Sequence, residues 1–326
     1  PSSLQNIPRA CYDVSGLWGM RMRLEFEHIY KSFGETHVLR DVSFSAQSGR
    51  VLGLLGRNGA GKTTIIRILM DIFKADQGRV LLDGKPLLGQ SVKIGYLPEE
   101  RGLYLKLKVS EQMIYLGQLK GLSKARARES SLRLLKRLEA DSYFDQKLET
   151  LSKGNQQKVQ LAIALVHDPG VVALDEPFSG LDPVNAHLLK ELILEQVSQD
   201  KIVVFSSHQM PYVEEFCQHI CILNQGGLVL DGQLREIKKS YPRSRIRIVP
   251  ERDAAGLAEK LASMRDWLRE VKTTDDGEVW VTLHTEKDKQ KLFQMVCGQG
   301  VDAISVMEPS LEEIFVEKAG GPIEAV

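Results

Sequence analysis

Long apolar runs are missing from this sequence. No stretch approaches the roughly 18 to 20 consecutive apolar residues that a membrane-spanning helix needs. The first 19 residues have neither a long apolar segment nor a clear periodicity, so they do not resemble a signal peptide. We interpret residues 1–21 as a tail of uncertain origin, with Met20 and Met22 as candidate natural starts. Any action at a membrane is therefore expected from outside the bilayer.

An excess of charge of either sign is also missing. The 43 basic and 43 acidic residues balance, so no overall field attracts nucleic acid or an anionic membrane. The hydrophobic share of 43% is enough to bury a core, and a length of 326 residues suggests about two domains. Partners must therefore be argued from local features.

Cysteine is scarce, with four residues in the whole chain, which fits a reducing cytosol better than a disulfide framework. Cys217, His219 and Cys221 are close enough in sequence to suggest a metal site, but no second cluster completes a set of four ligands. The simpler interpretation is that these thiols are half-buried where a helix meets a strand.

Buried strands alternate with amphipathic helices in the first two thirds of the chain. Apolar runs predict strands at 51–55, 171–174 and 202–205, and apolar periodicity predicts helices after residue 61 and over 188–197. The first of these helices is expected to include Ile66, Leu69, Met70 and Phe73. This alternation predicts an α/β fold with a parallel, mostly covered sheet. Two further strands between 24 and 46 are expected to flank a polar loop at 31–37.

Residues 105–140 are helical in character and rich in lysine and arginine. A surface for nucleic acid or lipid is one interpretation. The other, a solvated helical face, is favoured by the interleaved Glu129 and Glu139. A turn at Lys153-Gly154 and another helix are expected to follow.

The pattern changes after Gly232. Strand and helix signals follow in the order β-α-β-β-α-β, with a hairpin about Asp276-Gly277, which is the ferredoxin-like pattern. A final helix is expected to begin at Ser310, because Glu313 completes a capping box.

The strongest motif is Gly56-Arg57-Asn58-Gly59-Ala60-Gly61-Lys62-Thr63, a complete G-x-x-x-x-G-K-T between a predicted strand and a predicted helix. The glycines let backbone N–H groups point inward at phosphate oxygens, and the helix N-terminus adds partial positive charge. Lys62 is expected to reach the β- and γ-phosphates. Thr63 is expected to ligate Mg²⁺, and Thr64 belongs to the same ATP-binding segment. The motif predicts binding of ATP with Mg²⁺.

A second motif, Val171-Val172-Ala173-Leu174-Asp175-Glu176-Pro177, places two carboxylates directly after a buried strand. Ligand sites form at the carboxyl ends of parallel strands. Asp175 is therefore expected to hold Mg²⁺ beside Thr63. Glu176 is expected to orient or deprotonate an attacking water.

A third set of motifs resembles a known family. Leu151-Ser152-Lys153-Gly154-Asn155-Gln156-Gln157 resembles the signature motif of ABC ATPases, and Ser179-Gly180-Leu181-Asp182 resembles their D-loop. His208, after an apolar strand, resembles their switch histidine. The resemblance covers about residues 22–240.

The resemblance implies a P-loop NTPase fold over 22–240, with a RecA-like core, an antiparallel β subdomain and a helical subdomain at about 99–158. A small α+β accessory domain would occupy 241–326. The resemblance also implies a head-to-tail dimer, in which Ser152 and Gly154 of one subunit meet the ATP of the other and Asp182 lies nearby. Glu176 and His208 would be catalytic. Phe33 lies where the family stacks adenine, although Tyr30 competes for that role and Phe33 could equally be an edge-strand core residue.

The chain departs from the family at three positions. Glu99 stands where the family usually carries a glutamine, and it is expected to contact Mg²⁺ or its water. Lys153 replaces a signature glycine, and Asn155 stands at the glutamine position. Ser152 and Gly154 are kept, so the composite site is still expected.

Two stretches resemble one subfamily of the ABC ATPases. Residues 95–122, and 309–315 near the C-terminus, resemble ATPases of ABC-2-type exporters related to sodium-extrusion systems. This resemblance implies a cytoplasmic ATPase, peripheral on the inner face of the cell membrane, with separately encoded permease subunits and no nucleic-acid partner.

Two other functions are compatible with a nucleotide-binding loop. ABC ATPases of DNA repair carry a long coiled coil between the phosphate loop and the signature motif, but only about 90 residues separate Lys62 from Ser152 here. ABC ATPases of translation usually carry two ATPase halves, whereas this sequence shows one phosphate loop. A regulatory module that binds nucleotide without hydrolysing it is the other rival. The presence of Glu176 and His208 favours hydrolysis.

Overall fold

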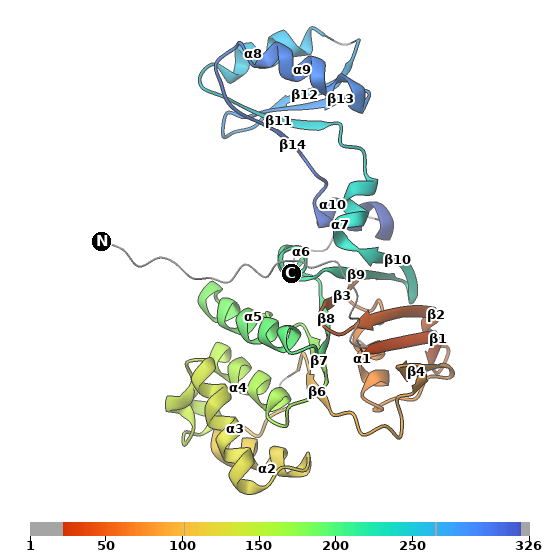
Figure 1. The fold of residues 1–326 in the computed structure, drawn as a ribbon, viewed down its shortest axis with the longest axis vertical. Helices are drawn as coiled ribbons and strands as arrows, with labels where there is room; N and C mark the ends of the chain where they lie inside the picture. Colours follow the sequence, from red (N-terminus) through yellow and green to blue (C-terminus); the bar gives the residue numbers. More distant parts are fainter. Residues whose placement is uncertain (1–21, 101, 265, 321–326) are drawn as a thin grey trace, which may run out of the picture.

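The computed structural model describes residues 22–320 except residues 101 and 265, so the predicted tail lies outside the described residues. A sheet of six strands, in the order β10-β9-β3-β8-β7-β6, forms the centre of the larger body in Figure 1. Its strands are β3 (Val51–Leu55), β6 (Ile94–Leu97), β7 (Val171–Asp175), β8 (Ile202–Ser207), β9 (His219–Asn224) and β10 (Gly227–Gln233). All neighbours pair in parallel except β9 and β10, which confirms the predicted parallel sheet.

A second sheet, in the order β2-β1-β4-β5, is antiparallel. Its strands are β1 (Arg23–Phe33), β2 (Thr36–Gln47), β4 (Gln77–Leu82) and β5 (Lys85–Pro86). The predicted loop at 31–37 was too long, because only residues 34 and 35 separate β1 from β2. Gly34 has a φ of 59°, which permits so tight a turn.

The strands of the central sheet are buried on both faces. Along β7, Val171 and Ala173 join the apolar cluster shared with the antiparallel sheet, whereas Val172 and Leu174 join the cluster under the helices. Successive side chains of a strand point to opposite faces, so one apolar run fills two cores.

Helix α1 (Lys62–Leu69) packs on the face shared with the antiparallel sheet, since Ile65 and Ile66 belong to that cluster. The cluster on the other face takes in residues of α2 (Val109–Leu119), α3 (Lys124–Arg137), α4 (Lys153–Leu165), α5 (Pro183–Ser198) and α6 (Met210–Phe216). There are 3₁₀ turns at Asp141–Tyr143 and Leu148–Thr150. Figure 1 shows α2, α3 and α4 gathered beyond β6 and β7. Within the described part of the chain, no helix combines the length and the apolar character needed to span a bilayer.

Two details of the helical prediction were wrong. The expected turn at Lys153-Gly154 is the first turn of α4, because the Ser152 hydroxyl accepts the N–H of Asn155 at 3.3 Å and caps the helix. Met70 caps the end of α1, which ends at Leu69, and Phe73 lies beyond it.

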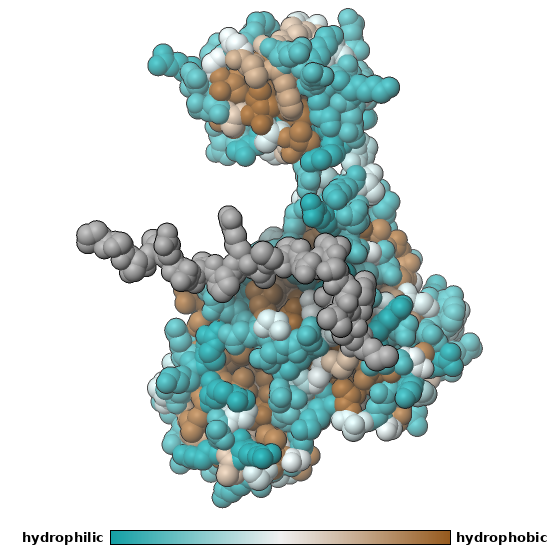
Figure 2. Space-filling view, in the orientation of Figure 1, coloured by the Kyte–Doolittle hydropathy of each residue, from teal (hydrophilic) through white to brown (hydrophobic). Residues whose placement is uncertain are grey.

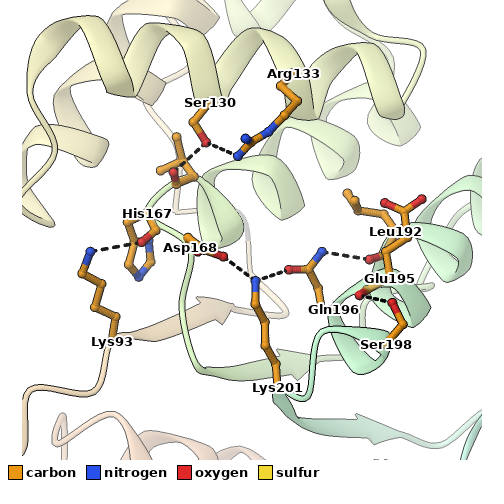
Figure 3. A network of polar contacts seen from close by, with 11 residues as sticks. Lys93, Ser130, Arg133, His167, Asp168, Leu192, Glu195, Gln196, Ser198 and Lys201 are labelled. Carbon is orange, nitrogen blue, oxygen red and sulfur yellow. Dashed lines mark hydrogen bonds and ion pairs between the residues drawn. The ribbon is translucent and has the colours of Figure 1, made fainter. Parts of the chain in front are cut away.

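A polar network fixes the helical region to the amino ends of the strands (Figure 3). Ser130 of α3 donates to the carbonyl of Val166 at 2.8 Å, and the His167 ring lies 3.2 Å from the carbonyl of Ile94. Lys201 bridges Asp168 and Gln196 at 2.5 and 2.7 Å. Burial lowers the pKa of His167 to about 4, so its ring stays neutral and the network keeps one arrangement near neutral pH.

A smaller unit follows, set apart from the larger body in Figure 1. After α7 (Leu234–Ser240) come β11 (Arg245–Pro250), α8 (Ala254–Ala262), β12 (Leu268–Thr273), β13 (Val279–Leu283), a 3₁₀ turn (Glu286–Asp288), α9 (Lys289–Val296) and β14 (Val301–Val306). The sheet order is β12-β13-β11-β14 with antiparallel neighbours, which confirms the ferredoxin-like pattern. This unit has its own apolar core, and Figure 2 shows some hydrophobic residues at its surface.

The last helix, α10 (Leu311–Ala319), leaves that unit and packs on the larger body. Its predicted capping box between Ser310 and Glu313 is present. Ile314 and Phe315 are fully buried in the cluster that also contains the helical face of the central sheet. The division of the chain near residue 240 stays a prediction, but the core of the larger body includes residues from beyond it.

Replacing Phe315 by alanine should therefore destabilise the larger body, by about 3 to 5 kcal/mol for a buried phenylalanine. Amide hydrogen exchange should rise in α6 and β9, which α10 contacts. Leu292→Ala, a buried change in the smaller unit, is the matched control and should raise exchange only in β11 to β14. Unchanged exchange in α6 and β9 of Phe315→Ala would contradict this role of α10.

Candidate functional site

The loop between β3 and α1 has the shape that a phosphate cradle requires. Gly61 has a φ of 106°, and a Cβ there would lie 2.5 Å from Cδ2 of Leu39. A Cβ at Gly56 would lie 2.8 Å from the carbonyl oxygen of Leu223. Any larger residue would displace the loop from the strands beneath it, so the two glycines fix its path.

Lys62 is buried at the first position of α1, and its ammonium group donates to the carbonyls of Gly56 and Arg57 at 2.7 and 3.3 Å. Burial lowers the pKa of Lys62, while the carboxylates of Glu176 and Asp175, and then that of Glu99, act in the opposite direction. Thr63 and Thr64 follow on the same turn of helix, half-buried. The structure thus places the loop's cation beside the acidic groups predicted to act with it.

Asp175 ends β7 and is 1% exposed. One of its carboxylate oxygens, Oδ1, accepts a hydrogen bond from the Ser206 hydroxyl of the neighbouring strand β8. The other, Oδ2, is buried and has no hydrogen-bond partner among the described residues. A buried carboxylate oxygen without a donor is costly unless a cation compensates it.

Glu176 directly follows Asp175 and contacts His208. Its Oε1 lies 2.7 Å from Nδ1 of His208, and its Oε2 accepts from the Ser207 hydroxyl at 3.2 Å. Burial raises the pKa of Glu176, and the bond to His208 partly opposes this rise. Its φ of 49° is unusual for a residue with a side chain, and its backbone is held by the N–H bond to the Ser206 carbonyl at 3.1 Å.

Glu99 follows β6, the next strand beyond β7, and is exposed. It lies close enough to Lys62 to raise that residue's pKa. The buried Gln160 of α4 donates to the carbonyls of Pro98 and Glu100, at 3.1 and 3.4 Å, and so holds the Glu99 segment from both sides. The position of Glu99 is therefore tied to the helix that begins with the signature-like motif.

Ser152 and Gly154 lie at the N-terminus of α4, where Ser152 is exposed and Gly154 is half-buried. A Cβ at Gly154 would lie 3.0 Å from the side-chain nitrogen of Asn185. Asp182 caps α5 by accepting the N–H of Asn185 at 3.0 Å. The structure thus brings Gly154 and Asp182 together at Asn185, and Ser152 lies two residues before Gly154.

Phe33, at the end of β1, is 43% exposed. Its ring meets the Phe73 ring edge-on, with centroids 5.1 Å apart, and the Lys31 ammonium lies 5.4 Å from its centroid. The competing Tyr30 is half-buried in the same strand. Phe33 is thus partly exposed beside Phe73 and Lys31, and its role in binding adenine stays a prediction.

Sequence reasoning missed three polar residues around the site, Ser206, Ser207 and Gln160. The two serines stand directly before His208, so their position was a signal that could have been used. The role of Gln160 depends on the packing of α4 against the end of β6, which no local pattern reveals.

Comparison with known proteins matches two families. Residues 39–179 match the family described as "ABC transporter". Residues 232–319 match "ATP-binding protein DrrA1-3-like, C-terminal domain". The second match covers the smaller unit together with α10.

Two of the three relatives described here match nearly the whole chain. "Uncharacterized ABC transporter ATP-binding protein YhaQ" of Bacillus subtilis (strain 168) is 40% identical over 303 residues, which cover 92% of this chain and all of the relative. "ABC transporter ATP-binding protein NatA" of the same organism is 34% identical, over 62% of this chain and 84% of its own. "Nod factor export ATP-binding protein I" of Rhizobium sp. (strain N33) is 28% identical, over 93% of this chain and 99% of its own length.

A solved structure confirms the expected fold. "Structure of ATP binding subunit of ABC transporter" superposes with a TM-score of 0.61 at 29% identity, over 66% of this chain and 92% of that one. The P-loop cassette predicted from the sequence is thus found in known proteins, and the predicted α+β C-terminal unit lies within the match to the DrrA1-3-like C-terminal domain. The full-length match to YhaQ, the cassette motifs and this superposition show that the chain belongs to the ABC transporter ATP-binding proteins.

Proposed function

We propose that this ABC ATP-binding subunit hydrolyses ATP with Glu176 as general base and His208 as the residue that positions it. One observation carries the proposal: the buried Glu176 carboxylate contacts His208 at 2.7 Å and lies close enough to Lys62 to oppose the lowering of the Lys62 pKa by burial. Lys62 and the N–H groups of the loop bind the phosphates. Glu176 accepts a proton from the water that attacks the γ-phosphorus.

The residues present fit a Mg²⁺ ion. Thr63 offers a hydroxyl at the start of α1, and Asp175 offers the buried oxygen without a partner. Oxygen ligands of this kind, completed by water and phosphate, are those that Mg²⁺ takes in nucleotide sites. When bound, the ion neutralises charge on the phosphate oxygens. Glu99, exposed on the same side, is suited to bind a water of that ion.

The nucleotide site is completed by a second copy of the subunit in this proposal. Ser152 and Gly154 lie at the N-terminus of α4, and Ser152 is exposed. A helix N-terminus and an exposed hydroxyl that can still donate its proton suit a phosphate group presented from outside. Head-to-tail closure would bring them to the partner's ATP, with Asp182 nearby and Phe33 on the adenine.

A membrane permease is the proposed partner beyond the second copy. Large apolar side chains are exposed around the start of the helical region and along α2, and they include Tyr104, Leu105, Leu107, Tyr115 and Leu119. Figure 2 shows hydrophobic residues at the surface of the lower part of the body. Exposed apolar groups that gather in one region mark interaction surfaces. With a Nod factor export protein among the relatives, we place the subunit on the inner face of the cell membrane, driving export.

Glu176→Gln should lower steady-state turnover by about 10²- to 10⁴-fold, because an amide cannot accept the proton of the attacking water. ATP binding, measured by equilibrium dialysis, should persist, since Lys62 and the loop are unchanged. Glu129→Gln, an exposed change on α3, should leave turnover as it is. Turnover within twofold of the wild type in Glu176→Gln would remove the assigned base.

On the acid side of the pH profile, kcat/KM should fall with a midpoint above the ordinary glutamate pKa of 4.5. The reason is that burial raises the pKa of Glu176 and only its carboxylate form is active. The His208 contact lowers that pKa, so His208→Ala should move the acid limb to higher pH. His187→Ala, an exposed histidine of α5, is the control. An acid limb that stays in place in His208→Ala would contradict this positioning role.

Tagged protein recovered from native membranes with ATP present should carry a polytopic membrane protein, identified by mass spectrometry. Leu119→Glu should reduce this recovery, because it places a charge on the exposed apolar side of α2. Val229→Glu, an exposed apolar position on β10, should not. Recovery of ribosomal or DNA-repair proteins in place of a permease would overturn the transport role.

A further inference from the structure

Three side chains with metal-ligand chemistry meet on the hairpin of β9 and β10, away from the nucleotide site. His219 and Cys221 are two residues apart on β9, so they project from the same face of the sheet. Asp231 pairs with Cys221 across the antiparallel ladder. The hairpin therefore delivers an imidazole, a thiol and a carboxylate to one place.

The three groups converge on a single oxygen atom. Oδ1 of Asp231 lies 2.6 Å from Nε2 of His219 and 3.2 Å from Sγ of Cys221. All three ligand atoms lie within 4.8 Å of one another. Tetrahedral zinc, with bonds of about 2.0 to 2.3 Å, separates its ligand atoms by about 3.5 Å. Shifts of about 1 Å in the side chains would give that geometry.

We propose that His219, Cys221 and Asp231 form a binding site for one Zn²⁺ ion. The thiolate and the carboxylate together neutralise the dication, so the occupied site carries no net charge. On binding, the metal replaces the thiol proton of Cys221, which leaves to solvent, and no electron is transferred. Thiolate and imidazole ligands favour Zn²⁺ over Mg²⁺ and Ca²⁺, which take oxygen ligands.

Burial around the cluster suits a site with one closed and one open side. Cys221 is fully buried in the core beneath the hairpin, whereas the side chains of His219 and Asp231 are 26% and 38% exposed. The exposed side chains can make the small adjustments that coordination needs. The buried thiol anchors the site.

A cleft gives the ion access. It has a volume of about 410 Å³ and is lined by His219, by Gly232 next to Asp231, and by the start of α7. Arg50 and Glu236 contribute one charge of each sign to its lining, so the cleft neither strongly attracts nor repels a cation. Water from the cleft can fill the fourth position of a tetrahedral ion.

The sequence suggested a different trio. Cys217 was grouped with His219 and Cys221, but its thiol packs under β3, where a Cβ on Gly53 would lie 2.9 Å from its sulfur. Asp231 takes its place, ten positions beyond Cys221 in sequence and adjacent to it through the hairpin. Pairing between strands thus supplies the third ligand that local spacing lacked.

The ion would fasten the hairpin from which the chain leaves for the smaller unit, because α7 begins directly after β10. Binding to the folded state alone stabilises it by mass action. The proposal is independent of ATP hydrolysis, since none of the three residues contacts the phosphate loop or Glu176 among the described hydrogen bonds.

Titration of the nucleotide-free, full-length protein with Co²⁺ tests the site. One Co²⁺ per chain should give tetrahedral d–d absorption and a near-ultraviolet charge-transfer band from thiolate to metal, and Zn²⁺ should displace both. Cys221→Ser should abolish the charge-transfer band. Asp231→Asn, nearly isosteric and partly exposed, should weaken Zn²⁺ binding by more than about tenfold. A loss of about tenfold is the smallest that is typical when a residue that only supports a metal ligand is replaced, and Asp231 is proposed to be a ligand itself.

Two controls separate this cluster from the other thiols. The double variant Cys11→Ser with Cys297→Ser should keep the band, and so should Cys217→Ser. ATP turnover in Asp231→Asn should match the wild type, which shows that the variant is folded. The proposal would be overturned if the wild type lacked the charge-transfer band or if Cys221→Ser kept it. Loss of the band in the double variant Cys11→Ser with Cys297→Ser would also overturn it.

Discussion

Parallel pairing of β3, β8, β7 and β6 places the carboxyl ends of these strands along one edge of the sheet, and the polar groups of the phosphate site come from that edge. Lys62 lies after β3, at the end of the phosphate loop. Asp175 is the last residue of β7 and Glu176 directly follows it, and His208 directly follows β8. These residues are far apart in the chain. Their meeting depends on strand register, which the two buried cores enforce, because a slip by one residue would turn each strand's apolar side chains to the wrong face.

The same edge concentrates charge that the protein must balance. Asp175 and Glu176 are both nearly fully buried, and two adjacent buried carboxylates are stable only with cations and donors close by. Lys62 supplies one charge, and Ser206 and Ser207 supply hydroxyl donors. The remaining oxygen of Asp175 lacks a donor within the described residues, and in the proposed mechanism a bound Mg²⁺ ion would complete the balance.

Much of this arrangement could be predicted from the sequence, because the motifs are local. The phosphate loop needs glycines at fixed positions, and Asp175 and Glu176 follow a run of apolar residues that can only be a buried strand. Features that depend on contacts between distant segments were missed. The donor to Asp175 is fixed by the register of β7 against β8, and Gln160 reaches the end of β6 only through packing of α4. Lys153-Gly154 was predicted to be a turn because glycine is common in turns, whereas Ser152 in fact caps a helix that begins at Lys153.

The position of α10 could not be predicted for the same reason, and it changes how the two units relate. Its sequence closes the C-terminal unit, yet its apolar face is buried in the core of the larger body. The carbonyls at its end accept from Asn224, at 3.1 Å, and from Arg57 of the phosphate loop, at 3.4 Å. If the loop shifts when it binds phosphate, either α10 shifts with it or the contact of Arg57 breaks. Because only residues 307–310 separate β14 from α10, the four-stranded unit is joined to the larger body through the packed helix α10 as well as through α7.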